Sequence, residues 1–201
     1  MPPSISILSR AKGPDAPGSG YLAGHFLIAM PHLPDARFQR SVVYLCAHTE
    51  EGAMGLIINK VLDSLTLPEL IAQLDIPPDE TKPEKVHFGG PVETSRGFVL
   101  HSCDYIESST VVVGHGLALT ATVEILRAIA RGTGPQQWMV ALGYADWGPG
   151  QLDAELQANA WLHGSANEDI VFDPQNDIKW ERAIQEIGVD ISMLSSESGH
   201  A

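Results

Sequence analysis

The chain has 201 residues, of which 44% are hydrophobic and 18% are charged, so it is long enough to bury a core of its own. Its formal net charge of −13 at pH 7 argues against direct nucleic-acid binding, because clustered Lys and Arg residues are needed to hold a phosphate backbone. No run reaches the roughly 20 apolar residues of a membrane helix, so we expect no membrane association.

The two cysteines, Cys46 and Cys103, each lie within an apparent strand. Buried thiols in a reducing compartment account for this pattern better than a disulfide framework does, although a redox pair remains an alternative. Because the first residues also lack the pattern of a secretory signal, we expect a cytoplasmic protein.

Residues 1–20 are rich in Gly, Pro, Ser and Ala and offer little apolar surface to offset the entropy of ordering. The composition therefore predicts a flexible N-terminal extension over residues 1–20 and one folded domain over residues 21–201.

The first half of that domain is predicted to centre on a β-hairpin. Val42 to Ala47 and Met54 to Ile58 are apolar and rich in residues that favour strands, and the polar turn between them contains Gly52. An earlier strand is expected over 26–30. Thr66 and Glu69 have the spacing of a capping box, which predicts a helix that ends before Pro77.

The second half predicts strands mixed with helices. We expect strands at 85–88 and 97–102 that form a second hairpin over residues 86–101. Further strands are expected at 110–113, 137–144 and 169–172, a loop at 145–150, and helices over 119–131, from Leu152 through Trp161, and over 177–187. The fold class predicted is α+β, a single compact domain whose mixed, largely antiparallel sheet is covered by helices.

Two pairs of soft ligands suggest one possible chemistry. Cys46 with His48, and His101 with Cys103, stand two residues apart, so each pair would share a strand face and could bind zinc if the two strands were neighbours. This spacing is not that of a dedicated zinc knuckle, and we predict no metal and no cofactor. Hydrolysis by Ser, His and Asp side chains is a further alternative, but no nucleophile elbow supports it.

Two glycine-rich stretches suggest binding. Gly89-Gly90-Pro91 could turn backbone N–H groups toward an anion, or could be a sharp turn that the topology requires. Tyr144 and Trp147 could form the walls of a pocket, with Asp146 or Gln151 adding polar specificity, or they could fill the core.

These stretches together resemble a known family. GHFLIAMPHLPDARFQRSVVYLCAH, GAMGLIIN, VHFGGPVETSRGFVLH and LGYADWGPGQLDAEL occur in this order and resemble the AlgH/YqgE family of bacterial proteins. The resemblance implies a cytoplasmic α+β domain over about residues 20–201. Members are described as uncharacterised or as proposed transcriptional regulators, with no assigned catalytic residues. Asp146 stands where the family's string commonly has Gly.

Polar side chains and glycines at strand ends predict one candidate ligand-binding cleft. Its residues are Asp35, His48, Asn59, Gly89, Gly90, His101, Tyr144 and Trp147. We interpret the chain as a regulatory protein that acts through a protein partner or a small ligand. The alternative is an enzyme or metal-binding protein built on a histidine-containing cleft, and direct DNA contact is the third hypothesis.

Overall fold

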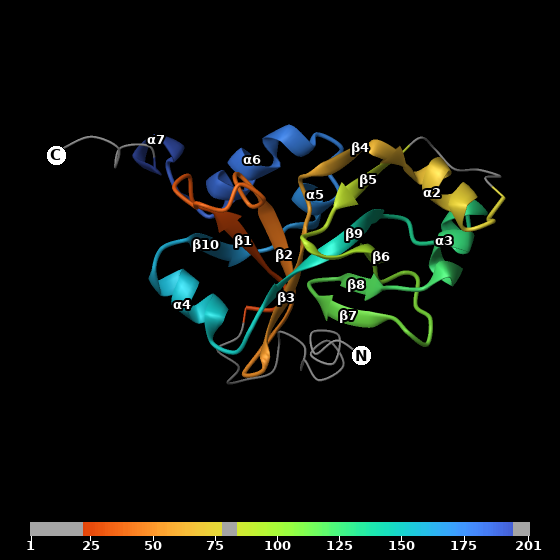
Figure 1. Cartoon of the computed structure of the whole chain (residues 1–201), viewed down its shortest axis with the longest axis horizontal. Helices are drawn as coiled ribbons and strands as arrows, with labels where there is room; N and C mark the ends of the chain where they lie inside the picture. The colour runs from red at the N-terminus through yellow and green to blue at the C-terminus, as the bar shows by residue number, and fades with distance from the viewer. Residues whose placement is uncertain (1–21, 78–83, 195–201) are drawn as a thin grey trace.

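A computed structural model describes residues 22–77 and 84–194 of the chain (Figure 1). The extension predicted over residues 1–20 lies outside these residues. In the described part, no helix has the length and apolar character needed to cross a bilayer.

The described residues form strands and mostly short helices. The strands are β1 (His25–Ala29), β2 (Val42–Thr49), β3 (Gly52–Ile57), β4 (Val61–Thr66), β5 (Lys85–Phe88), β6 (Val92–Ser102), β7 (Val111–Gly114), β8 (Leu117–Thr120), β9 (Trp138–Trp147) and β10 (Trp161–Ser165). The helices are α2 (Leu67–Gln73), α3 (Val123–Ala130), α4 (Gln151–Gln157), α5 (Glu168–Val171), the 3₁₀ helix η1 (Asn176–Ile178), α6 (Lys179–Glu186) and α7 (Ile191–Leu194).

One sheet connects all of these strands, in the order β10-β1-β2-β3-β9-β6-β8-β7, with β5 joining β9 and β4 joining β5. Every pairing is antiparallel except that of β5 with β9, which is parallel. The predicted α+β class and the largely antiparallel sheet are therefore confirmed.

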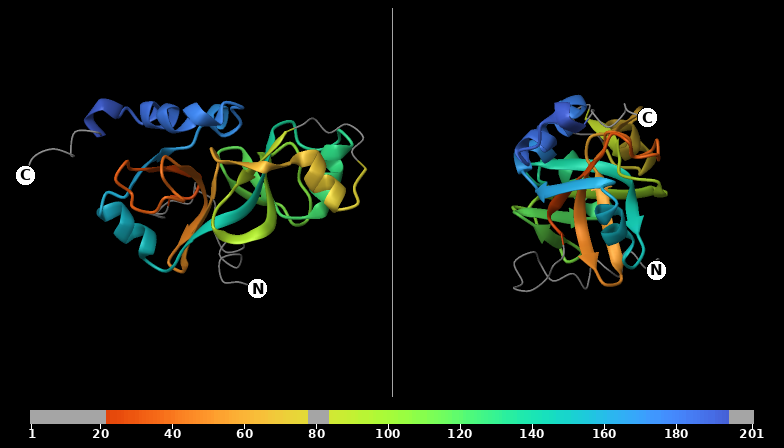
Figure 2. Two further views of the ribbon diagram at one scale, coloured as in Figure 1. Left: turned by 45° about the horizontal axis from the view of Figure 1, so that its top comes forward. Right: turned by 90° about the vertical axis from the view of Figure 1, so that its left-hand side faces the viewer.

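The sheet curls back on itself. Although β2 and β7 are not neighbours in the strand order, the Tyr44 hydroxyl on β2 donates a hydrogen bond to the Gly114 carbonyl oxygen on β7 at 3.0 Å. The helices lie around the outside of this curled sheet, with α4 near one end of the molecule and α2 and α3 at the other (Figure 2). Two of the three buried clusters reflect this arrangement, since one packs against α4 and another against α2 and α3.

The predicted hairpin is confirmed as β2 and β3, whose residues are almost all buried. Both faces of this hairpin are packed, because alternate residues of β2 belong to two different buried clusters: Tyr44 lies in a cluster with α6, and Leu45 in a cluster with α4. The capping box is also confirmed: the Thr66 backbone N–H donates to the Glu69 carboxylate at 2.7 Å, where α2 begins.

The second predicted hairpin, over residues 86–101, is wrong. Ala141 of β9 pairs with His87 of β5 on one side and with Phe98 of β6 on the other, so β9 lies between the two strands. Proximity in sequence favoured a hairpin, but β5 and β6 each pair instead with the long apolar strand β9.

Two predicted boundaries around β8 and β9 are also wrong. The helix expected from residue 119 begins at Val123, because Leu117–Thr120 forms β8 between β6 and β7. The loop expected at 145–150 begins only after Trp147, since Ala145 and Trp147 pair with β3.

Two assignments near the C-terminal end are corrected as well. The third predicted helix ends at Gln157, and Trp161 starts strand β10 rather than completing a helical face, because Asn159 adopts a φ of 56° that ends the helix. The strand expected at 169–172 is helix α5, which begins where the Asn167 side chain accepts a hydrogen bond from the Asp169 backbone N–H.

Gly89 and Gly90 stand where β5 passes closest to β9. A Cβ atom on Gly89 would lie 2.3 Å from the Gly143 carbonyl oxygen, and one on Gly90 would lie 2.1 Å from the Tyr144 carbonyl carbon. Gly90 also has a φ of 154°. These glycines permit a direct backbone contact between the β5–β6 connection and β9.

We predict that Gly89→Ala lowers the free energy of unfolding by about 1–3 kcal/mol, because the new methyl group would force the two backbones apart. Gly97→Ala on β6 is the matched control, since its Cβ would meet only a Leu142 methyl at 3.8 Å. Its effect should stay within about 0.5 kcal/mol. Urea denaturation of both variants measures the difference, and equal midpoints would contradict the close-contact explanation.

Candidate functional site

A hollow of about 520 Å³ opens beside α4, where the 31–40 loop meets the ends of β9 and β10. We call it the aromatic cavity. It is lined by Leu33, Pro34, Asp35, Arg37, Phe38, Pro91, Val92, Asp146, Trp147, Gln151, Glu155, Ala160 and Trp161.

Three aromatic rings form the wall of this cavity. The Trp147 and Trp161 ring centroids lie 5.9 Å apart in an edge-to-face arrangement, and Phe38 stands 6.5 Å from Trp147 and 5.7 Å from Trp161. Aromatic pairs in this geometry stabilise each other by about 0.5–1.5 kcal/mol beyond their buried area. The wall is therefore already formed without a ligand.

One carboxylate fixes both indoles. Oε2 of Glu155 accepts hydrogen bonds from Nε1 of Trp147 at 2.9 Å and from Nε1 of Trp161 at 2.8 Å, while its Oε1 accepts from the Gln151 side-chain amide at 2.9 Å. Because Gln151 and Glu155 are four residues apart on α4, they share a helix face turned toward the rings. This carboxylate consequently joins β9, α4 and β10.

The 31–40 loop, which supplies Phe38, also contributes charged residues to the cavity lining. The Arg37 guanidinium binds the Asp35 carboxylate, with its Nη2 2.7 Å from Oδ2 and its Nε 3.0 Å from Oδ1, and these hydrogen bonds hold the pKa of Asp35 below its ordinary value. The Arg37 backbone N–H also donates to Asp35 at 3.0 Å, which closes the turn. The Arg37 side chain is 60% exposed and that of Asp35 is 35% exposed, so the pair contributes little to stability.

Asn59, one of the predicted site residues, positions this loop rather than lining the cavity. Its Oδ1 accepts from the Val42 backbone N–H, and its Nδ2 donates to the Arg40 carbonyl oxygen, both at 2.8 Å. The neighbouring Lys60 ammonium donates to the Arg37 carbonyl oxygen at 2.7 Å. The end of the β3 strand therefore fixes the segment that supplies Arg37 and Phe38.

The other predicted residues divide between several places. Asp35 and Trp147 line the aromatic cavity, and the Gly89-Gly90 turn leads directly into Pro91 and Val92, which also line it. Tyr144 instead lies in the core, 5.7 Å from Phe98 between ring centroids, because residues three apart on a strand face opposite sides.

The structure does not bring His48 and His101 together. His48 pairs with Ala53, which pairs with Trp147 at one end of β9, whereas His101 pairs with Trp138 at the other end. A ten-residue strand is about 30 Å long. The histidine cleft and the Cys-His-His-Cys grouping that the sequence suggested are therefore not formed.

Each of these histidines has partners that suit a structural role. Nδ1 of His101 donates to the Ser102 carbonyl oxygen at 2.9 Å, and its Nε2 therefore accepts from the Thr120 hydroxyl at 2.8 Å. His48 accepts a hydrogen bond from the Leu22 backbone N–H and lies 3.7 Å from the Asp153 carboxylate. Burial lowers the pKa of both imidazoles.

Residues 22–77 and 84–194 contain no group of three or more His, Cys, Asp and Glu side chains arranged to hold a metal ion. Cys46 and Cys103 are both free thiols. Burial raises the pKa of the Cys46 thiol, which makes it a poor nucleophile.

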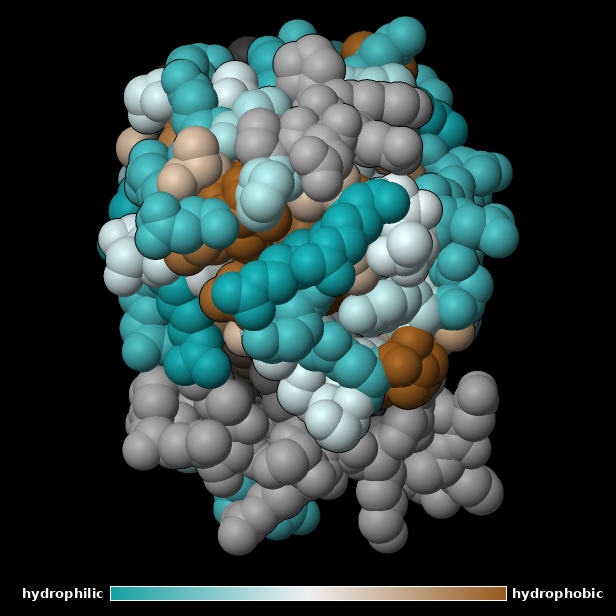
Figure 3. Space-filling view, turned by 90° about the vertical axis from the view of Figure 1, so that its right-hand side faces the viewer, coloured by the Kyte–Doolittle hydropathy of each residue, from teal (hydrophilic) through white to brown (hydrophobic). Residues whose placement is uncertain are grey.

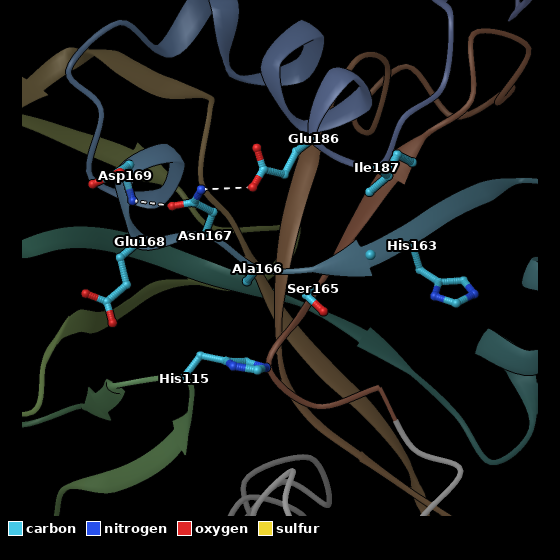
Figure 4. A pocket seen from close by; sticks show the side chains of 10 residues that line it. His115, His163, Ser165, Ala166, Asn167, Glu168, Asp169, Glu186 and Ile187 are labelled. Carbon is cyan, nitrogen blue, oxygen red and sulfur yellow. Dashed lines mark hydrogen bonds between the residues drawn. The ribbon is translucent and has the colours of Figure 1, made fainter.

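A larger hollow of about 730 Å³ lies where β10 and α5 face the β7–β8 turn (Figure 4). Its polar groups bind one another: the Asn167 side chain accepts from the Asp169 N–H and donates to Glu186. His115 and His163 lie well apart across it (Figure 4). We consider it a weaker candidate, because Asn167 and Glu186 already form hydrogen bonds at the start of α5 and the end of α6.

A further hollow of about 660 Å³ contains two buried titratable residues that sequence reasoning did not single out, His87 and Lys179. Nε2 of His87 donates to the Asn176 side-chain oxygen at 3.1 Å, and the Lys179 ammonium donates to the carbonyl oxygens of Ile58 and Val171 at 2.8 Å. Lys179 thereby ties α6 to the sheet and to α5, so its role is structural.

Hydrophobic surface is sparse at the end of the molecule that carries α2 and α3. Described residues there are mostly hydrophilic, with small separated hydrophobic patches (Figure 3). We consider the aromatic cavity at the α4 end the best candidate site, since three aromatic rings that contact one another line it beside exposed charges.

Sequence reasoning omitted several cavity residues from its site, among them Phe38, Glu155 and Trp161. A signal for Glu155 was present, because Gln151 and Glu155 stand four apart directly after Trp147 and so had to face one side of a helix. The sequence analysis placed Trp161 in a helix, so it did not predict that Trp161 starts β10 and lies beside Trp147.

Comparison with known proteins supports the family suggested by the motifs. A family model described as AlgH-like matches residues 26–192. The chain belongs to the AlgH-like family. A UPF0301 protein of Afipia carboxidovorans is 53% identical over 193 residues and 92% of each chain. Another UPF0301 protein, from Bradyrhizobium diazoefficiens, is 53% identical over 96% of this chain and 95% of its own.

Solved structures agree with this assignment. The solution structure of AlgH from Pseudomonas aeruginosa is similar to this fold with a TM-score of 0.76 and 43% identity, over 92% of this chain and 99% of its own. A crystal structure of a Corynebacterium diphtheriae protein has a TM-score of 0.69 over 98% of this chain and all of its own. At 20% identity it shows the fold alone. The names of these AlgH-like relatives state a family and not an activity.

We predict that Glu155→Gln lowers the free energy of unfolding by about 1–3 kcal/mol, because a neutral amide cannot accept from both indoles and from Gln151 with equal strength. Both indole N–H signals of Trp147 and Trp161 should shift in NMR spectra. Glu50→Gln, which removes an exposed carboxylate from the β2–β3 turn, is the control. If Glu155→Gln and Glu50→Gln denature at the same midpoint, the carboxylate does not hold the wall.

We further predict that His87 weakens the fold in acid. Burial lowers its pKa from 6.5 to about 4, so between these pH values the unfolded chain binds a proton that the folded chain does not. The free energy of unfolding should therefore fall as pH falls from about 6.5 to 4, with His87 contributing about 3 kcal/mol of the loss.

The measurement is denaturant unfolding across this pH range for the unmodified chain and for His87→Gln, whose amide can still donate to Asn176. The loss in acid should be smaller for His87→Gln by that amount. His163→Gln, on the exposed part of β10, should run parallel to the unmodified chain. Parallel curves for all three proteins would contradict the prediction.

Proposed function

We propose that this chain is a binding protein and that the aromatic cavity holds a segment of a protein partner. The observation that carries the proposal is the preformed wall of Phe38, Trp147 and Trp161, held by Glu155 beside an open hollow of about 520 Å³. A rigid aromatic wall loses little conformational entropy when a partner binds, so its rigidity favours a role in recognition.

The layout of the cavity supports a protein partner. Its centre is aromatic, while Pro34, Asp146 and Gln151 at its margin are exposed. Protein interfaces have this arrangement, with aromatic anchors at the centre and a polar rim. Grooves lined by aromatic residues are a known docking place for extended, proline-rich peptide segments.

A regulatory role through a partner, rather than through DNA, also agrees with the charge. The formal net charge of −13 repels a phosphate backbone. We place this interaction in the cytoplasm, because the two cysteines are free thiols. The alternative of an enzyme or metal-binding protein loses its main support, since His48 and His101 lie at opposite ends of β9.

We predict that a photo-crosslinking amino acid placed at Pro34 captures a discrete partner in bacterial cells that express the chain. The same amino acid at Val112 on β7, which is 58% exposed and outside the cavity, is the control. Capture from position 34 should disappear with Phe38→Ala, which removes one ring of the wall. The proposal fails if position 112 captures the same proteins or if Phe38→Ala changes nothing.

A further inference from the structure

Strand β10 forms one edge of the described sheet, because it pairs with β1 alone. Ala160, just before β10, accepts a hydrogen bond from the Met30 backbone N–H at 3.0 Å, and Ala166, just after β10, donates one to the residue before β1 at 3.3 Å. In an antiparallel pair, residues that bond to the partner strand alternate with residues whose N–H and C=O groups face away from it. The backbone groups of His163 and Ser165 therefore point away from β1, toward the open edge.

The hollow of about 730 Å³ lies along this open edge. It is lined by every residue from His163 to Asp169, and Figure 4 shows His163 and Ser165 beside it. Successive residues of a strand point to opposite faces of a sheet, so a hollow that touches His163, Gly164 and Ser165 in turn follows the strand's edge. Within the described part of the chain, the outward backbone groups of His163 and Ser165 have no hydrogen-bond partner. They are therefore available to another strand.

Two further strands, β4 and β7, lie at edges of the described sheet, and both are protected. The register of β4 with its neighbour shifts between Val61 and Thr66, and that of β7 shifts between Val112 and Gly114. The Gly114 carbonyl oxygen also accepts the Tyr44 hydroxyl. In contrast, β10 pairs with β1 without a shift and contains neither proline nor lysine. Irregular pairing, proline and lysine are the usual features that keep additional strands off an edge, so β10 is the edge best suited to accept one.

The charge of the hollow indicates which kind of strand fits. The described residues that line it include three carboxylates, on Glu168, Asp169 and Glu186, and neither lysine nor arginine. In residues 22–77 and 84–194, none of the three carboxylates forms an ion pair. A basic segment would supply the missing positive charge. A second copy of this chain would instead bring the same three carboxylates and a net charge of −13.

We infer that the open edge of β10 binds an extended, basic segment of a protein partner as an added β-strand. The backbone groups of His163 and Ser165 form the ladder hydrogen bonds, and alternate lysine or arginine side chains of the segment lie beside Glu168 and Glu186. Strand addition of this kind takes its affinity from main-chain hydrogen bonds and its specificity from alternate side chains. The hollow and the aromatic cavity share no described lining residue, so the inference does not rest on the proposed function.

The test uses the whole chain and one synthetic peptide, acetyl-Thr-Val-Lys-Val-Lys-Val-Thr-amide. When it is extended, its two lysines share one face. The first control peptide has glutamate in place of both lysines. The second control carries N-methyl groups on every lysine and valine, so it cannot donate ladder hydrogen bonds from either edge.

Amide hydrogen exchange followed by NMR is the direct measurement. In the free chain, the His163 and Ser165 amides should exchange quickly, because their N–H groups face solvent. A saturating amount of the lysine peptide should slow both at least roughly tenfold, since each then donates to the added strand. The Leu162 and Gly164 amides face β1 and serve as internal controls that should not change.

The peptides should also differ in affinity. The lysine peptide should bind roughly tenfold more tightly than the glutamate peptide at low salt, and raised salt should shrink this difference, because the carboxylates lie in an open hollow. The N-methylated peptide should not bind.

Variants of the chain separate strand addition from charge. Ser165→Pro removes an outward N–H that the fold does not use, so it should keep the denaturation midpoint and weaken binding roughly tenfold or more. Ser165→Ala retains the N–H and should bind as the unmodified chain does. Glu186→Gln should weaken binding of the lysine peptide several-fold, whereas Glu50→Gln, outside the hollow, should not.

Several outcomes would overturn the inference. Absence of binding by the lysine peptide, binding by the N-methylated peptide, or full binding by a folded Ser165→Pro variant would exclude strand addition. Equal affinity for the lysine and glutamate peptides would exclude selection by charge. Protection of the His163 and Ser165 amides that rises with chain concentration alone would identify a second copy of β10 as the occupant. The proposal for the aromatic cavity is decided separately, by capture from position 34.

Discussion

The close contact between the Gly89-Gly90 turn and β9 is the constraint on which the rest of the structure depends. Here the Ile57 backbone N–H donates to the Gly89 carbonyl oxygen, and the Gly89 N–H donates to the Leu142 carbonyl oxygen. The turn thus joins β3 and β9 at the point where β9 passes from pairing with β5 to pairing with β3. Side chains at these glycines would separate the strands, so the absence of Cβ atoms lets one strand connect both ends of the sheet.

The candidate site depends on the same strand. Trp147, the last residue of β9, lines the cavity, and so does Pro91, which follows Gly89-Gly90. Glu155 then connects Trp147 to Trp161 through two hydrogen bonds to one oxygen. A carboxylate that accepts hydrogen bonds from three N–H donors is fixed in place, so Glu155 shapes the wall of the cavity.

Local patterns predicted the local elements, and the long-range arrangement was beyond them. The β2–β3 hairpin, the capped start of α2 and the helix containing Trp180 follow from periodicity and capping residues. The position of β9 between β5 and β6 depends on pairings across 50 residues, which no window of sequence contains. Asp35 and Trp147 could be predicted as site residues from local signals. Their association with Glu155, and the separation of His48 from His101, depend on the order of strands in the sheet, which local signals do not contain.

The pairing of β1 with β10 joins residues about 140 positions apart, such as His25 and Ser165. A ribosome releases the chain from its N-terminus, so β1, β2 and β3 emerge long before β9 and β10 exist to cover their edges. Until β9 and β10 have been synthesised, the edges of the apolar strands β1 and β3 have no partner strand. Such unpaired edges favour aggregation and chaperone binding. The cavity, which combines residues from Leu33 to Trp161, can appear only after most of the chain has been synthesised. The cavity is accordingly a late product of folding, present only in chains that have closed the sheet.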